Sequence, residues 1–279
     1  MLESLINWLS QFLSEDWISS LEYLTNGKHL TWYASLRYTL GAGVFGAILA
    51  LIFGLTGAAM KRSGFLPFKL FGDFYTTIVR GVPDVLFFLF FPLAFEQAVE
   101  YFFARSKCSA TEIANAVAWP PCDAANWFLT TGDYFILACF SLGIVYGAFT
   151  ANVIHGAMGA VPKGQLEAAQ AYGFSSRQIF WRFHVRQMWV YALPGLSNVW
   201  MLLLKATSLL SLLQIADVVL WADRLGAPNY FPRVGLVHPD WRWKYYFALF
   251  VFYILMAMLS EWFFGKLQAR ASRGVVAVR

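Results

Sequence analysis

Three charged side chains, Arg80, Asp84 and Lys205, stand in or beside long apolar stretches of this sequence. An isolated charge inside a bilayer costs roughly 2.5–3.5 kcal/mol on insertion scales, so each charge needs a partner or water. Arg80 and Asp84 could pair across one helical turn as a structural ion pair. Any of the three could instead line a path that binds a polar solute. Both interpretations stay open, with structural pairing the commoner arrangement.

Side chains suited to covalent, metal or nucleotide chemistry are sparse. The four histidines and three cysteines show no paired spacing that suits a metal site. The sequence contains no glycine-rich phosphate loop, and no acid, base and nucleophile cluster stands out. We therefore expect that the chain is not an enzyme, that it holds no metal or cofactor, and that a separate subunit hydrolyses any ATP it depends on.

The composition places these charges in a membrane protein. Of the 279 residues, 59% are hydrophobic and 13% charged, whereas soluble domains carry roughly a quarter charged residues. The net charge is +5, and the basic residues are scattered without a dense run. That distribution favours contact with membrane lipid over binding of nucleic acid.

Five apolar segments are long enough to cross a bilayer, which takes about 20 residues of helix. They predict an all-α membrane domain with five transmembrane helices. The second segment is the weakest, because Asp84, Glu96 and Glu100 interrupt it. The five segments are 38–60, 82–103, 134–154, 189–216 and 245–265.

The distribution of lysine and arginine between the loops predicts the orientation. The loops 61–80 and 157–188 and the C-terminal tail together carry more basic residues than the loops on the other side. Under the positive-inside rule the N-terminus is periplasmic, and the C-terminus and loop 157–188 are cytoplasmic. Residues 1–30 show apolar side chains at roughly helical spacing among acidic ones, which predicts an amphipathic helix lying in the outer interface.

The cytoplasmic loop holds the most informative motif, a short helix with a marked start and stop. Pro162 suits a helix start and Gly173 suits a left-handed C-terminal cap, while Ser175 or Ser176 can cap the next helix. Two helices would therefore meet almost at one residue. Ala168 and Ala169 would leave one face of the short helix flat enough for close approach by a partner.

This motif resembles the signature of the permease subunits of bacterial ABC importers. Glu167, Ala168, Ala169 and Gly173 match its spacing, and two other stretches, 75–84 and 191–213, resemble the polar amino acid branch. Within that branch the sequence is most similar to permeases for histidine, lysine, arginine and ornithine, over roughly residues 32–265. The resemblance implies that 163–172 is a coupling helix. The implied coupling residues are Gly164, Glu167, Ala168, Ala169 and Gly173.

The resemblance also implies partners and a cargo. The expected partners are ABC ATPase subunits, a second permease subunit that is identical or paralogous, a periplasmic amino acid-binding protein and membrane lipid. The expected function is ATP-driven import of a polar amino acid, with a basic one favoured, across the bacterial inner membrane. Another polar amino acid or an opine on the same scaffold is the alternative cargo. A stand-alone secondary transporter is the rival class, and we detect no internal inverted repeats that would support it.

Three departures from the family pattern define what is particular to this chain. Arg186 stands where the family usually has a proline, so a helix can run straight through this point. The chain has about 30 additional N-terminal residues, and the periplasmic insertion near 104–132 is longer than expected, within a transmembrane domain spanning 31–279. Cys108 and Cys122 lie in that insertion, where the periplasm permits a disulfide. The alternative is two unrelated thiols.

Overall fold

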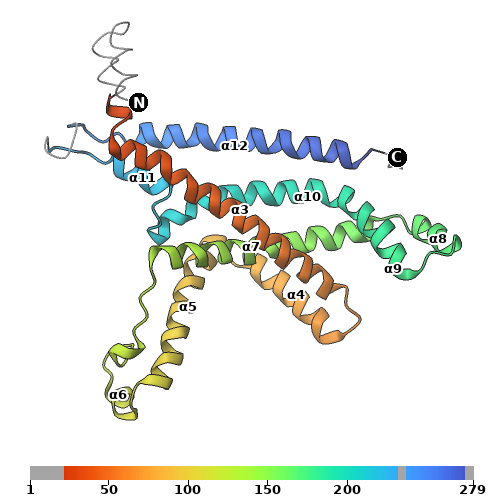
Figure 1. Ribbon diagram of the computed structural model, residues 1–279, viewed down its shortest axis with the longest axis horizontal. Helices are drawn as coiled ribbons and strands as arrows, with labels where there is room; N and C mark the ends of the chain where they lie inside the picture. The colour runs from red at the N-terminus through yellow and green to blue at the C-terminus, as the bar shows by residue number, and fades with distance from the viewer. Residues whose placement is uncertain (1–21, 232–236, 274–279) are drawn as a thin grey trace, which may run out of the picture.

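A computed structural model describes residues 22–231 and 237–273 of the chain (Figure 1). The described part is helical, and its one β-type pairing is an isolated bridge between Asn229 and His238. Five stretches are long and apolar enough to cross a membrane, which confirms the five predicted spans. They are α3 (Gly27–Lys61), α5 (Asp84–Lys107), α7 (Thr131–Ala160), Ser176–Leu213 and α12 (Arg242–Ala271). The amphipathic helix predicted within residues 1–30 lies largely outside the described residues.

The fourth span is built from several consecutive helical pieces. It comprises α9 (Ser176–Gln178), a π-helix η2 (Ile179–His184), α10 (Val185–Ala206) and a 3₁₀ helix η3 (Thr207–Leu213). A shorter helix, α11 (Val218–Gly226), follows and packs against α3 and α12. The span therefore begins 13 positions before the predicted 189 and ends three before the predicted 216.

The centre of the molecule is the crossing of α3 and α7, which pack closely along much of their lengths (Figure 1). Glycines make this approach possible. A Cβ added at Gly143 would lie 2.5 Å from Leu49 Cβ, and one at Gly147 would lie 2.6 Å from Phe53 Cβ. Small residues allow helix backbones to approach in lipid, where dispersion contacts replace the hydrophobic effect as the force for association.

Helix α4 (Leu66–Gly81) was not predicted, because its residues were assigned to a cytoplasmic loop. It packs beside α3 and α7, with Gly72 and Thr76 buried. Leu66, Leu70 and Phe74 are exposed at four-residue spacing. Its apolar stripe therefore faces outward, as suits lipid, and its small residues face the other helices.

Lys61 ties the three helices α3, α4 and α7 together near their cytoplasmic ends. Its ammonium donates to Asn152 Oδ1 at 2.7 Å and to Thr76 Oγ1 at 3.1 Å. It also lies 3.5 Å from Asp73 Oδ1. Because the side chain of Lys61 is mostly buried, these partners satisfy a charge that would otherwise be costly at this depth.

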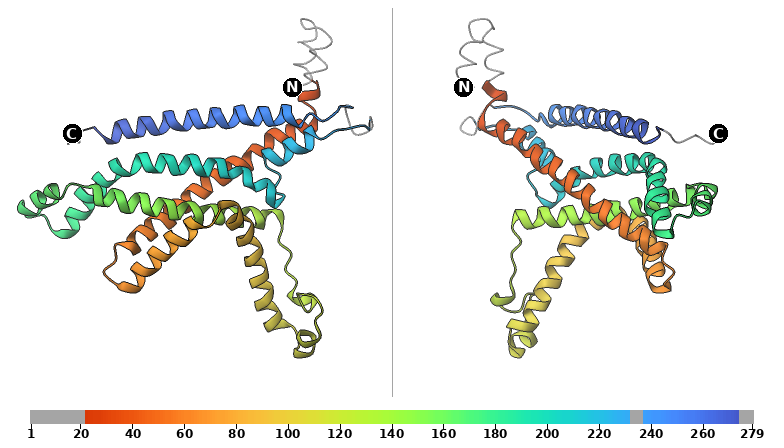
Figure 2. Two further views of the ribbon diagram at one scale, coloured as in Figure 1. Left: turned by 180° about the vertical axis from the view of Figure 1, so that it is seen from behind. Right: turned by 45° about the vertical axis from the view of Figure 1, so that its right-hand side comes forward.

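Helix α4 leads into the second span, α5, with a break between the two helices. Val82 and Pro83 have extended backbone, with ψ angles of 136° and 130°. Proline has no N–H and disfavours helical geometry in the preceding residue, which accounts for the break. Helix α5 then diverges from the other spans and reaches α6 (Ala110–Asn115) at its far end (Figures 1 and 2).

The loop beyond α5 is closed by a covalent bond. Cys108 and Cys122 form a disulfide across 14 positions, with their Cα atoms 5.9 Å apart. A short 3₁₀ helix, η1 (Asp123–Ala125), follows and packs back on α5. The insertion 104–132 is therefore a structured finger that continues α5.

The ends of the helices are sorted as the predicted topology requires. The helices of loop 157–188 lie at the same end as the C-terminal end of α12, while the start of α3 and helix α11 lie at the opposite end (Figures 1 and 2). Loop 157–188 and the C-terminal end of α12 therefore share one side, the predicted cytoplasmic side.

We predict that Gly54→Ala destabilises the fold, because a methyl group there would overlap the side chain of Thr150 on α7. Overpacking of this kind costs about 1–3 kcal/mol. Gly265→Ala on α12 is the matched control, since nothing lies within 4 Å of its added Cβ. Thermal unfolding of both variants in detergent should show a lowered midpoint for Gly54→Ala alone. Equal midpoints would contradict the role of this contact.

Candidate functional site

The predicted coupling helix is α8 (Lys163–Ala171), and its C-terminal stop is well defined. Gly173 has φ +81°, and its N–H donates to Gln170 O while Phe174 N–H donates to Ala169 O. These two bonds form a Schellman motif, in which a left-handed glycine ends the helix. Ser175 then caps α9 in a capping box with Gln178. The predicted sharp junction between two helices is confirmed.

The two alanines of the motif face different ways. Ala168 is exposed, whereas Ala169 is 4% exposed and faces the chain itself. The expectation that both alanines form one flat outer face was therefore wrong. Because successive helical residues are rotated by about 100°, adjacent positions seldom share a face. Gly164 and Glu167 are exposed with Ala168, and Gly173 is exposed at the stop.

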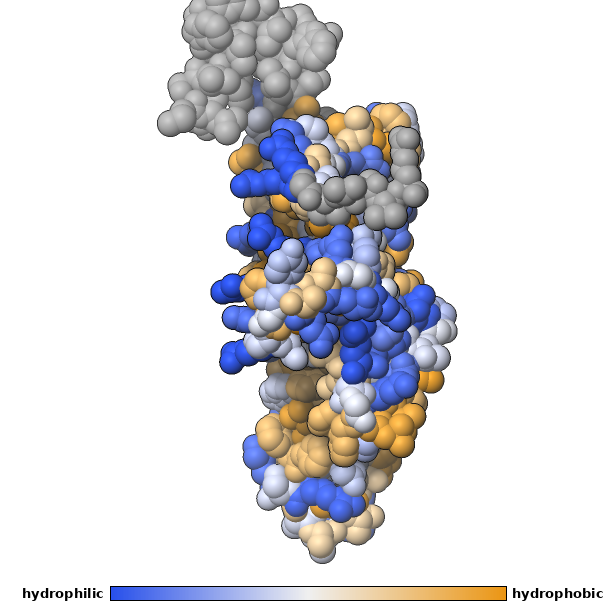
Figure 3. Space-filling model, turned by 90° about the vertical axis from the view of Figure 1, so that its right-hand side faces the viewer, coloured by the Kyte–Doolittle hydropathy of each residue, from blue (hydrophilic) through white to orange (hydrophobic). Residues whose placement is uncertain are grey.

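Figure 3 looks onto the end of the molecule where α8 and α9 project, and shows polar side chains gathered there. Beside α8 runs a groove of about 430 Å³, lined by Glu167 and Gln170 of α8 and by Ile179 and Phe180 of η2. This end, on the predicted cytoplasmic side, therefore presents a polar surface with a groove that polar and apolar side chains line together. Such a surface suits contact with another protein.

The helix runs on from α9 through Arg186 into α10 without a kink at that position, as predicted from the missing proline. The irregularity lies just before it, in the π-helix Ile179–His184. His184 Nε2 donates to Met158 O of α7 at 2.9 Å, and the rings of Phe174 and Phe183 meet edge to face at 5.1 Å. These contacts fasten α8 and η2 to the third span.

The fourth span is fastened to the third along its length as well. A Cβ added at Gly195 of α10 would lie 2.7 Å from Val153 Cγ1 of α7. Pro194 precedes this glycine inside the helix. The close contact means that a displacement of η2 or α10 is carried to α7 directly, without an intervening loop.

Arg80 and Asp84 are not paired with each other. The break at 82–83 separates them onto different helices, and no ion pair joins them within the described residues. Arg80 instead lies 5.2 Å from the ring centroid of Phe149, and Asp84 Oδ2 accepts from Tyr146 O–H at 2.9 Å. The predicted ion pair was wrong because the extended backbone of 82–83 interrupts the helical turn that would have aligned the two charges.

Lys205 lies in the last turn of α10, and its side chain is exposed. Within the part of the chain that the structure describes, its ammonium has no hydrogen-bond or ion-pair partner. Just beyond it, η3 packs against α5, where Phe88 and Leu210 share one apolar core. Asp84 on α5 and Lys205 on α10 are thus joined through η3, which contacts both helices. Neither has an opposite charge within ion-pair distance among the described residues.

The sequence alone did not indicate which residues contact Arg80 and Asp84. Tyr146 and Phe149 are on α7, three positions apart, and their rings stack with centroids 6.0 Å apart. They gave no signal in an apolar span, because aromatic residues are ordinary there. Helix α4 did have a signal: the four-residue spacing of Leu66, Leu70, Phe74 and Ile78 is typical of an amphipathic helix.

A bundle of five candidate membrane spans, with a capped helix pair projecting at one end, is the arrangement expected of a transport permease. The chain belongs to the family of binding-protein-dependent transport system inner membrane components, whose sequence profile matches residues 45–273. It is therefore a multi-pass permease subunit of the inner membrane.

Comparisons with individual proteins support the same family assignment. The chain is 32% identical over 239 residues to the histidine/lysine/arginine/ornithine transport system permease protein HisQ of Escherichia coli K12, covering 85% of this chain and 91% of HisQ. It is 28% identical over 235 residues to the arginine ABC transporter permease protein ArtQ of the same organism, covering 84% of this chain and 92% of ArtQ. A crystal structure of an amino acid ABC transporter with histidines has the same fold, with a TM-score of 0.66 and 20% identity over 92% of this chain and all of that one.

We predict that Ala169→Asp loosens α8 while Ala168→Asp leaves it intact. A carboxyl group at the buried position 169 lacks solvent. Burying even an uncharged polar group without a partner costs about 1–3 kcal/mol in proteins, and an ionised carboxylate costs more. A change at an exposed position usually stays within about 0.5 kcal/mol. Amide hydrogen exchange across residues 163–171, followed by mass spectrometry, should rise only in Ala169→Asp. Equal protection in both variants would contradict the assigned facing of the two alanines.

Proposed function

We propose that this chain imports an amino acid with a basic side chain, driven by ATP that separate ABC subunits hydrolyse. The observation that carries the proposal is that Asp84 on α5 and Lys205 on α10, two helices that both contact η3, have no ion-pair partner among the described residues. A basic amino acid carries both a carboxylate and additional cationic charge. Lys205 would attract the carboxylate, and Asp84 would attract a cation of the cargo.

The surroundings of Asp84 favour this role over a purely structural one. Its described hydrogen-bond partner, Tyr146, is neutral, and Asp84 is only half-buried at the start of α5. A structural carboxylate at this depth would be expected to have a cation beside it. The nearby Arg80 is engaged by the ring of Phe149 instead, so it can guide the cargo without neutralising Asp84.

Names of relatives support the same cargo class. HisQ is named for histidine, lysine, arginine and ornithine, and ArtQ for arginine. Relatives from Rhizobium radiobacter and Agrobacterium fabrum are named for octopine and nopaline, which keeps an opine as the alternative cargo. Import of a basic amino acid or of an opine would need no cofactor on this chain.

The geometry of α8 supports a division of roles among the coupling residues that the family resemblance implies. We assign docking on the ATPase to Gly164, Glu167 and Ala168, which are exposed. Ala169 and Gly173 act differently: the first packs inward and the second ends the helix. Closure of the ATPase would push α8, and the bonds from η2 to α7 would carry that movement to the spans. Coupling requires that the inward-facing and outward-facing states of the transporter differ in their affinity for the cargo or for the ATPase.

A second permease subunit, identical or paralogous, would complete the path. Helix α5 buries only Phe88, Pro92 and Ala104, and the charged cluster at its start is open on one side. A periplasmic binding protein would deliver the cargo from the outer face, as the family description of a binding-protein-dependent system suggests.

We predict that Asp84→Asn reduces uptake of arginine about tenfold or more, while binding of the ATPase is unchanged. Loss of one charge-assisted contact is worth about 1.5–3 kcal/mol, and 1.4 kcal/mol is a factor of ten. Radiolabelled uptake into proteoliposomes by the complete transporter measures this effect. Glu261→Asn, at an exposed carboxylate near the cytoplasmic end of α12, is the control. Undiminished arginine uptake by Asp84→Asn would show that Asp84 does not bind the cargo.

We predict that Ala168→Asp abolishes uptake while the chain still inserts and folds. The added carboxylate lies on the exposed face of α8 and obstructs close approach of a partner. Uptake and co-purification of the ATPase should both fall, and hydrogen exchange of α8 should stay as in the unaltered chain. Wild-type uptake by this variant would refute the docking assignment.

A further inference from the structure

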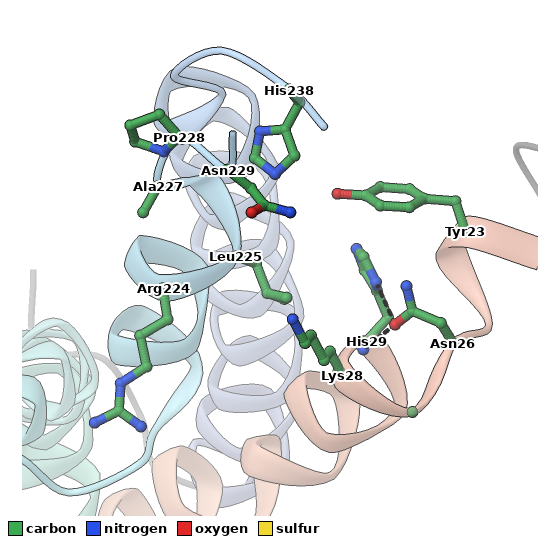
Figure 4. Close-up of a pocket in the computed structure, with 11 residues that line it drawn as sticks. Tyr23, Asn26, Lys28, His29, Arg224, Leu225, Ala227, Pro228, Asn229 and His238 are labelled. Carbon is green, nitrogen blue, oxygen red and sulfur yellow. Dashed lines mark hydrogen bonds between the residues drawn. The ribbon is translucent and has the colours of Figure 1, made fainter. Parts of the chain in front are cut away.

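Helix α3 is fastened by polar groups at both ends, but in different ways. At the outer end, beside a cavity of about 570 Å³, Asn26 Oδ1 accepts from His29 N–H at 3.0 Å (Figure 4). Tyr245 O–H donates to His29 Nε2 at 2.8 Å. Hydrogen bonds within the chain thus engage these outer groups. At the opposite end, on the predicted cytoplasmic side, charged groups gather around the turn that joins α3 to α4.

Three cations and one carboxylate meet at this inner turn. Their charges all act on the imidazole of His155 on α7, which places them close together; they are Lys61, Arg62, Lys69 and Asp73. Lys61 lies 3.5 Å from Asp73 Oδ1, so these two charges offset each other. Arg62 and Lys69 are exposed, and neither forms an ion pair with a described residue. Two positive charges at the turn therefore have no opposite charge from the described part of this chain.

The length of α3 places these cations at the depth of the lipid headgroups. Residues 38–60 are 23 residues without a charge, between Arg37 and Lys61. As an α-helix they are about 34 Å long, enough to cross a hydrocarbon core of about 30 Å. Helix α4 begins at the same turn without a side-chain cap, so the positive end of its dipole adds to the charge of Arg62 and Lys69. The phosphates of the inner leaflet lie at this level.

An open, mostly apolar groove of about 670 Å³ runs along α4 from this turn. The large side chains of its outward stripe, Leu66, Leu70 and Phe74, are 59–63% exposed. Asp73 is the one charged residue that lines the groove, and Lys61 engages it. The lining residues are Pro67, Leu70, Phe71, Asp73, Phe74, Thr77 and Ile78. An apolar groove with free cations at one end matches a molecule that has an apolar chain and an anionic head.

We propose that the turn and groove bind an anionic phospholipid of the inner leaflet, with its phosphate at Arg62 and Lys69 and an acyl chain along α4. Charge complementarity selects this occupant, because a zwitterionic lipid would bring a cation of its own to the same place. An acidic side chain of a soluble protein would satisfy the cations and leave the groove uncovered. A neutral apolar helix would cover the groove and leave the cations unpaired. A lipid bound there would brace α4 against α3 beside the contacts of Lys61.

The test uses the complete transporter in phosphatidylcholine nanodiscs with increasing amounts of phosphatidylglycerol. Phosphatidylglycerol with a photoreactive acyl chain should label residues 62–78. Arg62→Gln combined with Lys69→Gln should lower the affinity obtained from this labelling about tenfold or more, because each basic residue near an anionic headgroup adds to the binding. Arg270→Gln combined with Arg273→Gln is the matched control. It removes the same charge at the end of α12, away from α4 (Figures 1 and 2), and should leave the labelling unchanged.

A second variant, Leu70→Gln combined with Phe74→Gln, removes apolar surface from the groove without changing its charge, and it should also weaken the labelling. Equal loss of labelling in the α12 control would overturn the proposal, because general positive charge on that side of the membrane would then explain the binding.

Two further outcomes would assign the surface to another occupant and so contradict the proposal. In the first, glycerol phosphate raises the thermal unfolding midpoint of the transporter in phosphatidylcholine as far as phosphatidylglycerol does, which would indicate a site for soluble phosphate. In the second, the variant at Arg62 and Lys69 keeps its lipid labelling but loses the ATPase or the second permease subunit on purification. The surface would then be a protein interface.

Discussion

The close crossing of α3 and α7 is the contact on which the remaining structure depends. In lipid the outer faces of helices gain nothing by leaving solvent, so association must come from tight atomic contact and polar bonds. Glycines at 143 and 147 supply the contact, and Lys61 supplies the bonds by reaching Asn152 on α7 and Thr76 on α4. The remaining helices are arranged around this fixed pair.

The two sites of the proposed function, the coupling helix and the charges that would bind the cargo, are both attached to α7. Near the end of α7, Met158 O accepts a hydrogen bond from His184 of η2, which follows α8, the proposed coupling helix. Near the middle of α7, Tyr146 and Phe149 hold Asp84 and Arg80. Under the proposed function, a displacement applied at α8 would reach Asp84 and Arg80 through this one helix, which would give a short mechanical route between ATP hydrolysis and cargo.

Much of this arrangement could be predicted from the sequence, and the misses have a common origin. Apolar runs report on each segment's contact with lipid, and they predicted the five spans. The capping pattern from Pro162 to Ser175 is local, so it too could be predicted. The facing of Ala169, the break after Gly81 and the partners of Arg80 depend on which helix lies opposite. A single sequence holds no direct record of such neighbours. Helix α4 was the avoidable miss, because its apolar spacing was visible.

The π-helix at Ile179–His184 sets the direction in which α8 faces as well as the length of the fourth span. A π-turn is equivalent to one residue inserted into an α-helix, and one residue corresponds to about 100° of rotation. A lineage that lost one residue here would keep the signature and the span but turn α8 about the helix axis, away from its ATPase. Insertions and deletions at this joint should therefore be strongly restricted during evolution, even where the identity of the side chains is free to drift.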